Sequence, residues 1–534
     1  MKIALTTFVA LAVAASSILP VFAETANADV FTLDGPTRTT PFKQADFKWA
    51  VHPRHDYSKT YVAKLFLAQA EFEPERLGRY KMRDNGRQTV CMDCEKALEA
   101  IKGMDALTLG LPKIVYLVGW QYNGHDSKYP AFFEGNRGVA RPCDKDPLDS
   151  VRWLMREAKK YHTTVSLHIN LFDAFEDSPL FKEYVREDVL AREKDGSFIF
   201  GDWGYKVSYA AEWEKGLLQR RIDRLCELLP IREAGTIHVD AFHNAVPFPV
   251  VGANGRHSIR MRSPISPWHG HTHEQDMEAK RKIVKYLDSK GIDVTTEGVG
   301  GMDVGGGREG YFPMYWHYGA REYALALKAS QACGGNVYGS QCAFGGNVNG
   351  EAVFRSNPDL AKAFDVFKRG FCKTTLITQY LNTFGRKALI EGKDGSIGVF
   401  EGGVRTMWKG GRLSIAKDGV ILSDGCDMLI PAVWLGGGGT DWESRHLGGG
   451  ALVAYSENGC RNRKWKVPAG VKLSDNVKAW RITAKGREAF SDFKYDGNIL
   501  TITLSPNEMV LLQPVDAAAG GNGATTSVQA VSKQ

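Results

Sequence analysis

The sequence predicts an α/β protein in which a (β/α)8-like barrel is followed by an antiparallel β-sandwich module. Strand-like and helix-like segments alternate over residues 45–385, a pattern typical of parallel strands joined by helical crossovers. Over residues 386–514, short segments of alternating polarity are separated by Gly, Asn and Asp, as in antiparallel sheets. The 534 residues also exceed the usual size of one domain. A doubly wound open sheet is the second interpretation of the first region.

The elements of the predicted barrel have local signals. Four apolar segments are predicted to be strands: 113–120, 163–170, 236–240 and 292–297. The three segments that are predicted to be helices lie between these strands: 146–162, 212–230 and 274–291. Asp146 is a plausible N-cap and Pro147 suits the first helical position. Pro230 is expected to stop the second helix, and Gly291 to end the third.

The two ends of the chain are predicted to lie outside these domains. Residues 1–23 carry a lysine at position 2, continue with an apolar stretch and end on Val-Phe-Ala, a pattern typical of a cleaved signal peptide. Residues 24–44 are interpreted as a lead-in, and residues 515–534 have too few apolar side chains to fold. No later segment has 18 unbroken apolar residues, so no membrane span is expected in the mature protein. We therefore expect a secreted or periplasmic protein.

Charge and cysteine content exclude some classes of function. The net charge of +7 is spread along the chain, and no basic run is interleaved with aromatic residues, so nucleic acid is not an expected partner. Nine cysteines in a long chain do not form the dense framework of a small disulfide-stapled domain. Cys91 and Cys94 form a CxxC pair without a thioredoxin-like context, so a local disulfide or plain thiols are expected.

Three predicted strands share a pattern that points to a site. Alternate side chains are polar, and the strands end on Asn170, Asp240 and Glu297. Helices should cover the apolar faces, so the polar faces should point to the barrel axis, with the strand ends at the catalytic face of such barrels. Paired carboxylates there suggest glycoside hydrolysis, with one carboxylate as nucleophile or base and the other as proton donor. The alternative is that both are ordinary hydrogen-bonded residues at the barrel mouth.

Two loops and one strand position add candidates. His125 and Asp126, in the loop 119–130, could hold sugar hydroxyls, or Asp126 could bond its own backbone in a turn. Trp203 and Tyr205 could stack on a sugar ring or anchor their loop. His238 shares a strand face with Asp240 and either orients it or is a core histidine.

These segments, taken in order, resemble the catalytic module of glycoside hydrolase family 101, the endo-α-N-acetylgalactosaminidases, and also look like the related family 129. The matching segments are GLPKIVYLVGWQYNGHDSKYP, VSLHIN, GDWGYK, TIHVDAFHN and VTTEG. The resemblance covers roughly residues 90–300 and is weaker to about residue 385. No single segment is specific, but their shared order strengthens the resemblance.

The resemblance implies a retaining reaction in which Asp240 is the nucleophile and Glu297 the acid/base. It implies that a group of side chains lines the subsite for an α-linked GalNAc: His125, Asp126, His168, Asn170, Trp203 and Tyr205. The implied substrate is the core-1 disaccharide Galβ1-3GalNAc, α-linked to Ser or Thr of mucin-type glycoproteins. No cofactor and no metal are expected.

The chain also departs from this family pattern. Asp240 and Glu297 are 57 positions apart (297 − 240), more than the resemblance implies, because residues 247–273 form an insertion. His269, His271 and His273 alternate at its end, and a solvated or substrate-facing loop is expected there rather than a metal site. The insertion leaves two alternatives open: an exo-acting α-N-acetylgalactosaminidase or α-galactosidase, and a carbohydrate-binding barrel without activity.

Overall fold

The structure is a computed structural model, and it describes most of the chain. The described residues are 30–44, 48–72, 84–201, 204–240, 242, 247–251, 257–261, 266–298, 310–317, 348–349, 352–435, 450–468, 470–471, 473 and 476–514. The predicted signal peptide and the predicted C-terminal tail lie outside them. None of the helices in this part of the chain is both long enough and apolar enough to cross a membrane.

The first region contains a parallel sheet of seven strands. They are β2 (Tyr61–Phe66), β5 (Lys113–Val118), β6 (Thr163–Asn170), β10 (Thr236–Asp240), β13 (Asp293–Gly298), β14 (Tyr315–His317) and β15 (Val348–Asn349). Their order is β14-β13-β10-β6-β5-β2-β15, and every neighbouring pair is parallel. Neighbours in the sheet thus follow chain order from β2 to β14, and β15 returns to the far side of β2. Helices alternate with these parallel strands, so the mixed α/β architecture is confirmed. The described residues contain no pairing of β14 with β15, so a closed barrel stays a prediction.

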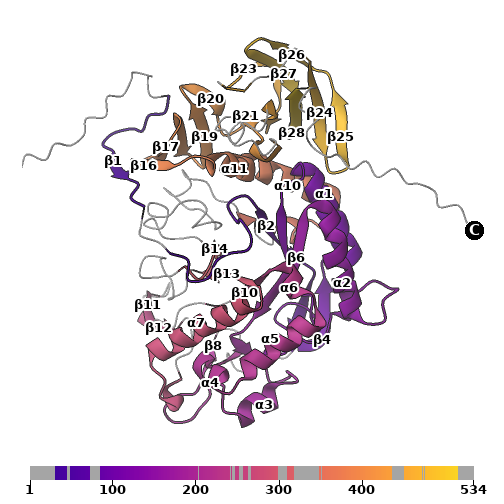
Figure 1. Cartoon of the computed structure of the whole chain (residues 1–534), viewed down its shortest axis with the longest axis vertical. Helices are drawn as coiled ribbons and strands as arrows, with labels where there is room; N and C mark the ends of the chain where they lie inside the picture. Colours follow the sequence, from indigo (N-terminus) through magenta and orange to yellow (C-terminus); the bar gives the residue numbers. More distant parts are fainter. Residues whose placement is uncertain are drawn as a thin grey trace, which may run out of the picture.

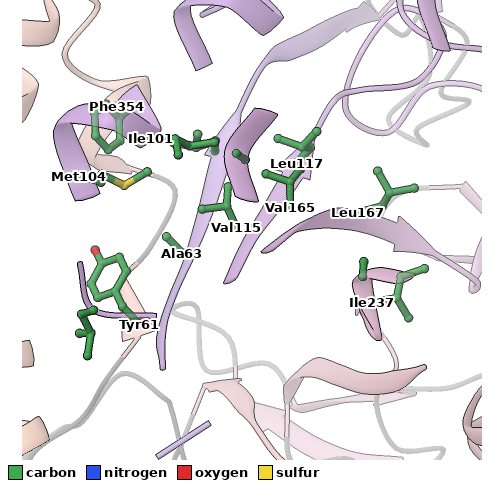
Figure 2. Close-up of a cluster of buried hydrophobic side chains, with 14 of the residues drawn as sticks. Tyr61, Ala63, Ile101, Met104, Val115, Leu117, Val165, Leu167, Ile237 and Phe354 are labelled. Atoms are coloured by element: carbon green, nitrogen blue, oxygen red, sulfur yellow. The ribbon is translucent and has the colours of Figure 1, made fainter. Parts of the chain in front are cut away.

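Helices cover one face of this sheet, as the strand periodicity predicts. The main ones are α1 (Cys94–Leu107), α2 (Pro147–Glu157), α5 (Leu217–Leu228) and α7 (His273–Ser289). Figure 2 shows Val115, Val165 and Ile237 of neighbouring strands in one apolar cluster with Ile101 and Met104 of α1. These side chains are buried, because alternate strand residues point to the helices and away from the polar face.

The predicted helix ends are partly right. Asp146 accepts a hydrogen bond from Leu148 N (2.9 Å) and Pro147 is the first residue of α2, as predicted. The single helix predicted over 212–230 is wrong: α4 (Tyr209–Glu214) and α5 are separate helices. Gly216 has φ +70° between them, a left-handed conformation that only glycine adopts at little cost, and it breaks the helix.

The second region is an antiparallel sheet of eleven strands (Figure 1). In sheet order they are β1 (Arg38–Pro41), β16 (Arg386–Glu391), β17 (Gly395–Phe400), β18 (Val404–Lys409), β19 (Arg412–Lys417), β20 (Val420–Ser423), β21 (Asp427–Pro431), β22 (Leu452–Ser456), β28 (Glu508–Pro514), β24 (Val477–Thr483) and β25 (Gly486–Phe490). Residues 38–41, interpreted from the sequence as a separate lead-in, pair with β16 and extend this sheet.

A small antiparallel sheet packs on the large one through a second apolar core. It consists of β23 (Cys460–Lys466), β27 (Ile499–Leu504) and β26 (Phe493–Asp496). Trp465 and Leu500 from this sheet are buried with Leu452 and Leu512 of the large sheet. The two layers therefore share one core, as alternating apolar strand residues favour.

Helices join the two regions. Figure 1 shows α10 (Leu360–Gly370) and α11 (Ile377–Leu381) between the parallel sheet and the antiparallel sheet. One apolar cluster contains Leu107 of α1, Phe371 between these helices, and Met509 of β28. Because residues of both regions are buried in this cluster, the interface between them is part of the main core.

The remaining described elements belong to loops and short pairings. They are β3 (Ala68–Phe72), β4 (Asp84–Val90), β7 (Asp173–Ala174), α3 (Phe181–Arg186), β8 (Phe200–Gly201), β9 (Gly204–Lys206), α6 (Ile231–Ala234), β11 (Pro247–Val251), β12 (His257–Met261) and α9 (Ala352–Arg355). Strands β7, β8 and β9 form one small sheet after β6, and β11 and β12 form a hairpin after β10. Both therefore follow the C-terminal ends of parallel strands, where (β/α) barrels carry their active sites.

Candidate active site

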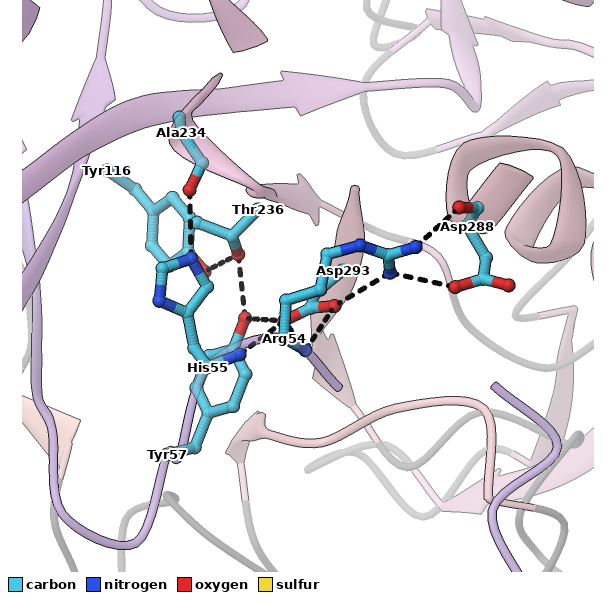
Figure 3. Close-up of polar contacts among 8 residues, drawn as sticks. All are labelled: Arg54, His55, Tyr57, Tyr116, Ala234, Thr236, Asp288 and Asp293. Atoms are coloured by element: carbon cyan, nitrogen blue, oxygen red, sulfur yellow. Dashed lines mark hydrogen bonds and ion pairs between the residues drawn. The ribbon is translucent and has the colours of Figure 1, made fainter. Parts of the chain in front are cut away.

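A hydrogen-bonded layer lies at the N-terminal ends of the parallel strands (Figure 3). The hydroxyls of Tyr57 and Tyr116 lie 2.8 and 2.7 Å from Thr236 Oγ1. Tyr57 also donates to Asp293 Oδ2 (3.3 Å), and the backbone N of Arg54 donates to both oxygens of that carboxylate (3.0 Å each). Burial raises the pKa of Tyr116 to about 12, so this phenol stays protonated. The layer holds the first residues of β10 and β13 together, at the opposite end of these strands from Asp240.

Three histidine rings lie next to one another above this layer. His238 Nδ1 is hydrogen-bonded to Thr295 Oγ1 (3.0 Å), and its ring is stacked on His168 with a centroid separation of 5.4 Å. The ring of His168 in turn meets that of His125 edge-on at 5.1 Å. His238 is fully buried and bonded to Thr295, which favours the interpretation as a core histidine.

Asp240 lies beside His168, the middle ring of this row. It is the last residue of β10 and pairs in register with Asn170, the last residue of β6. The carboxylate oxygen Oδ2 is 3.4 Å from His168 Nε2, and the Asp240 side chain is 15% exposed whereas that of His168 is 2% exposed. The carboxylate is thus partly exposed and contacts a buried imidazole.

The imidazole beneath Asp240 is neutral at neutral pH. Burial lowers the pKa of His168 to about 4, and the opposing attraction of Asp240 is smaller. Both ring nitrogens of His168 are buried, and the contact of Nε2 with Asp240 is long at 3.4 Å. A neutral ring carries one donor and one acceptor, which are the groups that a sugar hydroxyl can satisfy.

Acid should therefore destabilise the protein through His168. The unfolded chain takes up this proton near pH 6.5 and the folded chain only near pH 4, so stability is lost as pH falls through that window. We expect this residue to contribute about 3 kcal/mol of the decrease in the free energy of unfolding between these pH values. Urea unfolding at pH 7 and pH 4.5 should show a smaller difference for His168→Gln than for wild type.

His52→Gln is the matched control, because His52 is exposed. It should keep the pH dependence of the wild-type protein. An unchanged pH dependence in His168→Gln would contradict the buried neutral imidazole.

The loop after β5 brings His125 to the same place. The backbone N of His125 donates to Ala68 O (2.8 Å), and its ring meets Phe66 edge-on at 5.5 Å. His125 Nε2 lies 3.4 Å from Asp126 Oδ2, and both side chains are partly exposed. The predicted pair therefore lies at the strand ends and beside His168. Its role in holding sugar hydroxyls stays a prediction.

Gly119 is required for this loop to approach β3. It has φ +77°, and a Cβ there would lie 2.0 Å from Ala68 O, the acceptor of the His125 bond. We expect Gly119→Ala to lower the free energy of unfolding by about 2–4 kcal/mol, since both the backbone conformation and the contact with a backbone oxygen are unfavourable. Chemical denaturation measures the loss.

Gly86→Ala separates these two causes. Gly86 has the same φ of +77°, but nothing lies within 4 Å of its added Cβ. It should cost only about 1–2 kcal/mol, the penalty of the left-handed conformation. Equal losses in the two variants would show that the contact with Ala68 does not matter.

Asn170 has a role that was not predicted from its sequence position. Its Oδ1 accepts hydrogen bonds from the backbone N of Phe172 (2.7 Å) and of Asp173 (3.0 Å), and its Nδ2 donates to Asp173 Oδ2 (2.8 Å). Asp173 is also paired with Lys206 at 2.5 Å. The amide therefore stabilises the turn after β6, a known use of Asn side chains.

Tyr205 is held within its loop. Its hydroxyl donates to Glu176 Oε1 (2.7 Å), and its ring contacts the rings of Phe181, Phe198 and Phe200 at centroid separations of 5.3, 5.7 and 5.1 Å. This favours the loop-anchoring interpretation over stacking on a sugar. Trp203 lies outside the described residues.

The second predicted catalytic carboxylate is placed only by its backbone. Glu297 is a residue of β13, two positions after Thr295, whose side chain meets His238. Its side chain lies outside the described residues, so its separation from Asp240 stays a prediction.

One group within the described residues could hold a metal ion. The ligand atoms of His125, His168 and Asp240 lie within 4.8 Å of one another. The same three groups suit a cluster of sugar hydroxyls, and we expect no metal. His269 and His271, at the end of the insertion, instead contact different carboxylates: His269 Nε2 is 3.5 Å from Asp188, and His271 Nε2 is 3.3 Å from Glu214.

A known family model matches part of this chain. Residues 90–260 match the glycoside hydrolase family 101 model, described as endo-α-N-acetylgalactosaminidase, and the resemblance predicted from the sequence is confirmed. This segment contains His125, His168 and Asp240. The match supports the interpretation of this chain as a glycoside hydrolase.

The solved structures that match this chain are distant in sequence. The α-N-acetylgalactosaminidase NagBb of Bifidobacterium bifidum has 11% identity and a TM-score of 0.43, over 67% of this chain and 57% of that chain. A family 36 α-galactosidase of Geobacillus stearothermophilus has 14% identity and a TM-score of 0.36, over 79% and 54%. An α-amylase of Geobacillus thermoleovorans has 9% identity and a TM-score of 0.36, over 86% and 100%. The chain thus spans little more than half the length of the first two.

Proposed function

Because residues 90–260 match glycoside hydrolase family 101, we propose that the protein is a retaining glycosidase of mucin-type O-glycans. Its proposed substrate is the core-1 disaccharide Galβ1-3GalNAc, α-linked to Ser or Thr. The observation that carries the proposal is the position of Asp240. This carboxylate is partly exposed at the end of a parallel strand and lies 3.4 Å from a buried, neutral imidazole.

The proposed reaction has two steps. Asp240 attacks the anomeric carbon and forms a glycosyl ester, while Glu297 gives its proton to the departing Ser or Thr oxygen. Glu297 then takes a proton from water, which attacks the anomeric carbon and releases Asp240 as a carboxylate. A neutral His168 supports both steps, because it contacts the carboxylate without neutralising its charge by proton transfer.

A panel of substrates tests the proposal. It contains aryl glycosides of the core-1 disaccharide, α-GalNAc and α-galactose, together with a mucin glycopeptide. We expect release of the intact disaccharide from the aryl core-1 substrate and from the glycopeptide. Release of single sugars alone would favour the exo-acting alternative, and no hydrolysis would favour a carbohydrate-binding barrel.

The stereochemistry of the first product tests the mechanism. Proton NMR of the early reaction should show the α-anomer, because two inversions retain the configuration. An initial β-anomer would exclude a covalent intermediate on Asp240.

We also propose that the protein acts outside the cell or in the periplasm. N-terminal sequencing of the exported protein should then begin after residue 23, the end of the predicted signal peptide.

A further inference from the structure

Trp268 is an exposed aromatic side chain in the insertion. It lies in a short 3-10 turn (Pro267–His269), and 51% of its surface is exposed. Among the described residues, five large apolar side chains are exposed, and Trp268 is the one aromatic side chain of the five. The reaction proposed above does not use this ring.

The position of this ring is fixed by hydrogen bonds. The indole Nε1 donates to Asp188 Oδ2 (3.0 Å), and the backbone N of Trp268 donates to Arg192 O (3.2 Å). The buried hydroxyl of Ser266 accepts from the backbone N of Arg192 (2.8 Å). Gly196 lies under the ring, since a Cβ there would be 3.3 Å from Trp268 Cζ3. An exposed ring that is held in place loses little conformational freedom when it binds a ligand.

Polar groups surround the ring. Arg192 Nε donates to Asp188 Oδ1 (2.7 Å), and its guanidinium lies 4.0 Å from the centroid of Phe198. Asp188 is 41% exposed, and His269 Nε2 is 3.5 Å from its Oδ2. A flat apolar surface edged by a carboxylate and an imidazole suits a sugar ring, which presents C–H groups on its faces and hydroxyls at its edge.

Trp268 is connected to Asp240 through the loops that follow β6; we call its exposed ring the Trp268 platform. Asp240 pairs in register with Asn170, and three residues later Asp173 pairs with Lys206 of β9. The backbone N of Ala191 donates to Lys206 O (2.8 Å), and Arg192, the next residue, accepts from Trp268. Four backbone spacings of ~4.8 Å and four chain steps of up to ~3.8 Å therefore place Trp268 at most roughly 35 Å from Asp240.

We propose that Trp268 binds a second sugar ring of the substrate, namely the GalNAc of a neighbouring O-glycan on the same mucin-like peptide. An extended peptide covers ~3.3 Å per residue, so two glycans up to about ten residues apart span distances within this limit. The proposal rests on the function proposed above for its choice of sugar and peptide. It assigns the insertion a role in selecting densely glycosylated substrates.

The test compares two synthetic peptides. One carries a single core-1 glycan, and the other carries two core-1 glycans six residues apart. We expect wild type to hydrolyse the doubly glycosylated peptide with a kcat/KM about threefold to tenfold higher, the range that one aromatic contact supplies. Trp268→Ala should lose this preference, and Trp268→Phe should keep most of it. Hydrolysis of the aryl core-1 glycoside should be equal in all three proteins.

Ile499→Ala is the matched control, because Ile499 is exposed on β27 of the other region. It should leave the preference unchanged, and melting temperatures should show that each variant is folded. The proposal is overturned if wild type shows no preference, if Trp268→Ala keeps it, or if Trp268→Ala slows the aryl glycoside as much as the peptides. A change in oligomeric state on gel filtration, with the preference intact, would assign Trp268 to a protein contact instead.

Binding separates this proposal from the proposed function. If none of the proteins hydrolyses either peptide, calorimetry measures their affinities for wild type and for Trp268→Ala. A preference for two glycans that disappears in the variant would support the platform while the proposed activity fails. Equal affinities in the two proteins would overturn the platform as well.

Discussion

Asp240→Asn should lower kcat for aryl core-1 hydrolysis by at least about 10³-fold, because the amide cannot form the glycosyl ester. The amide has nearly the same shape, and the Asp240 side chain is partly exposed, so the melting temperature should change little. The measurement is the steady-state rate of aryl release, together with the thermal melting curve of the same sample.

Asp177→Asn is the matched control for this exchange. Asp177 lies in a loop after β6 and pairs with Lys128 at 2.8 Å. Its replacement removes a carboxylate from the same face of the fold and should leave kcat within about threefold, as expected for a partly exposed ion pair. Asp240→Asn with unchanged kcat would remove the nucleophile assignment.

Arg221→Met should cause the largest loss of stability. Arg221 of α5 and Glu212 of α4 are buried, with Nη2 and Oε2 2.8 Å apart. Arg221 also donates to Leu171 O (3.1 Å) and Pro130 O (3.3 Å), so it connects two loops at the strand ends. The variant leaves a buried carboxylate without its cation, and we expect a loss of about 3–5 kcal/mol in chemical denaturation.

The loss should depend on pH. Burial raises the pKa of Glu212, and Arg221 opposes that shift in the native protein. Without Arg221 the folded carboxyl should keep its proton, whereas the unfolded chain ionises above about pH 4.3. The folded state then binds more protons, so the stability of the variant should fall as pH rises above that value. A deficit that is the same at pH 5 and pH 8 would contradict this explanation.

Two further variants complete the experiment. Arg224→Met, one turn further along α5, removes an exposed ion pair with Glu227 at 3.0 Å and should cost less than about 1 kcal/mol. The double variant Glu212→Gln/Arg221→Met should recover much of the stability, because no charge remains buried and Tyr184, which now bonds Glu212, can still bond the amide.

Local sequence pattern determined the strand faces correctly. Alternation in 163–170 and 236–240 predicted that Val165 and Ile237 meet the helices and that His168 and Asp240 lie on the opposite face. The period of a strand is a local property, so it can be read without knowledge of the fold. The same reasoning failed for the helix predicted over 212–230, where Gly216 breaks the helix between two amphipathic segments.

The sequence by itself thus determined the α/β class, the polar face of the sheet and the carboxylate at the end of β10. Only the tertiary structure decided that His125 meets His168, that Asn170 is used in a turn, and that β1 pairs with β16. Contacts of this kind join residues that are far apart in the chain or depend on how a loop closes. Periodicity fixes the side to which a residue points, but strand register and loop geometry decide which partner it meets there.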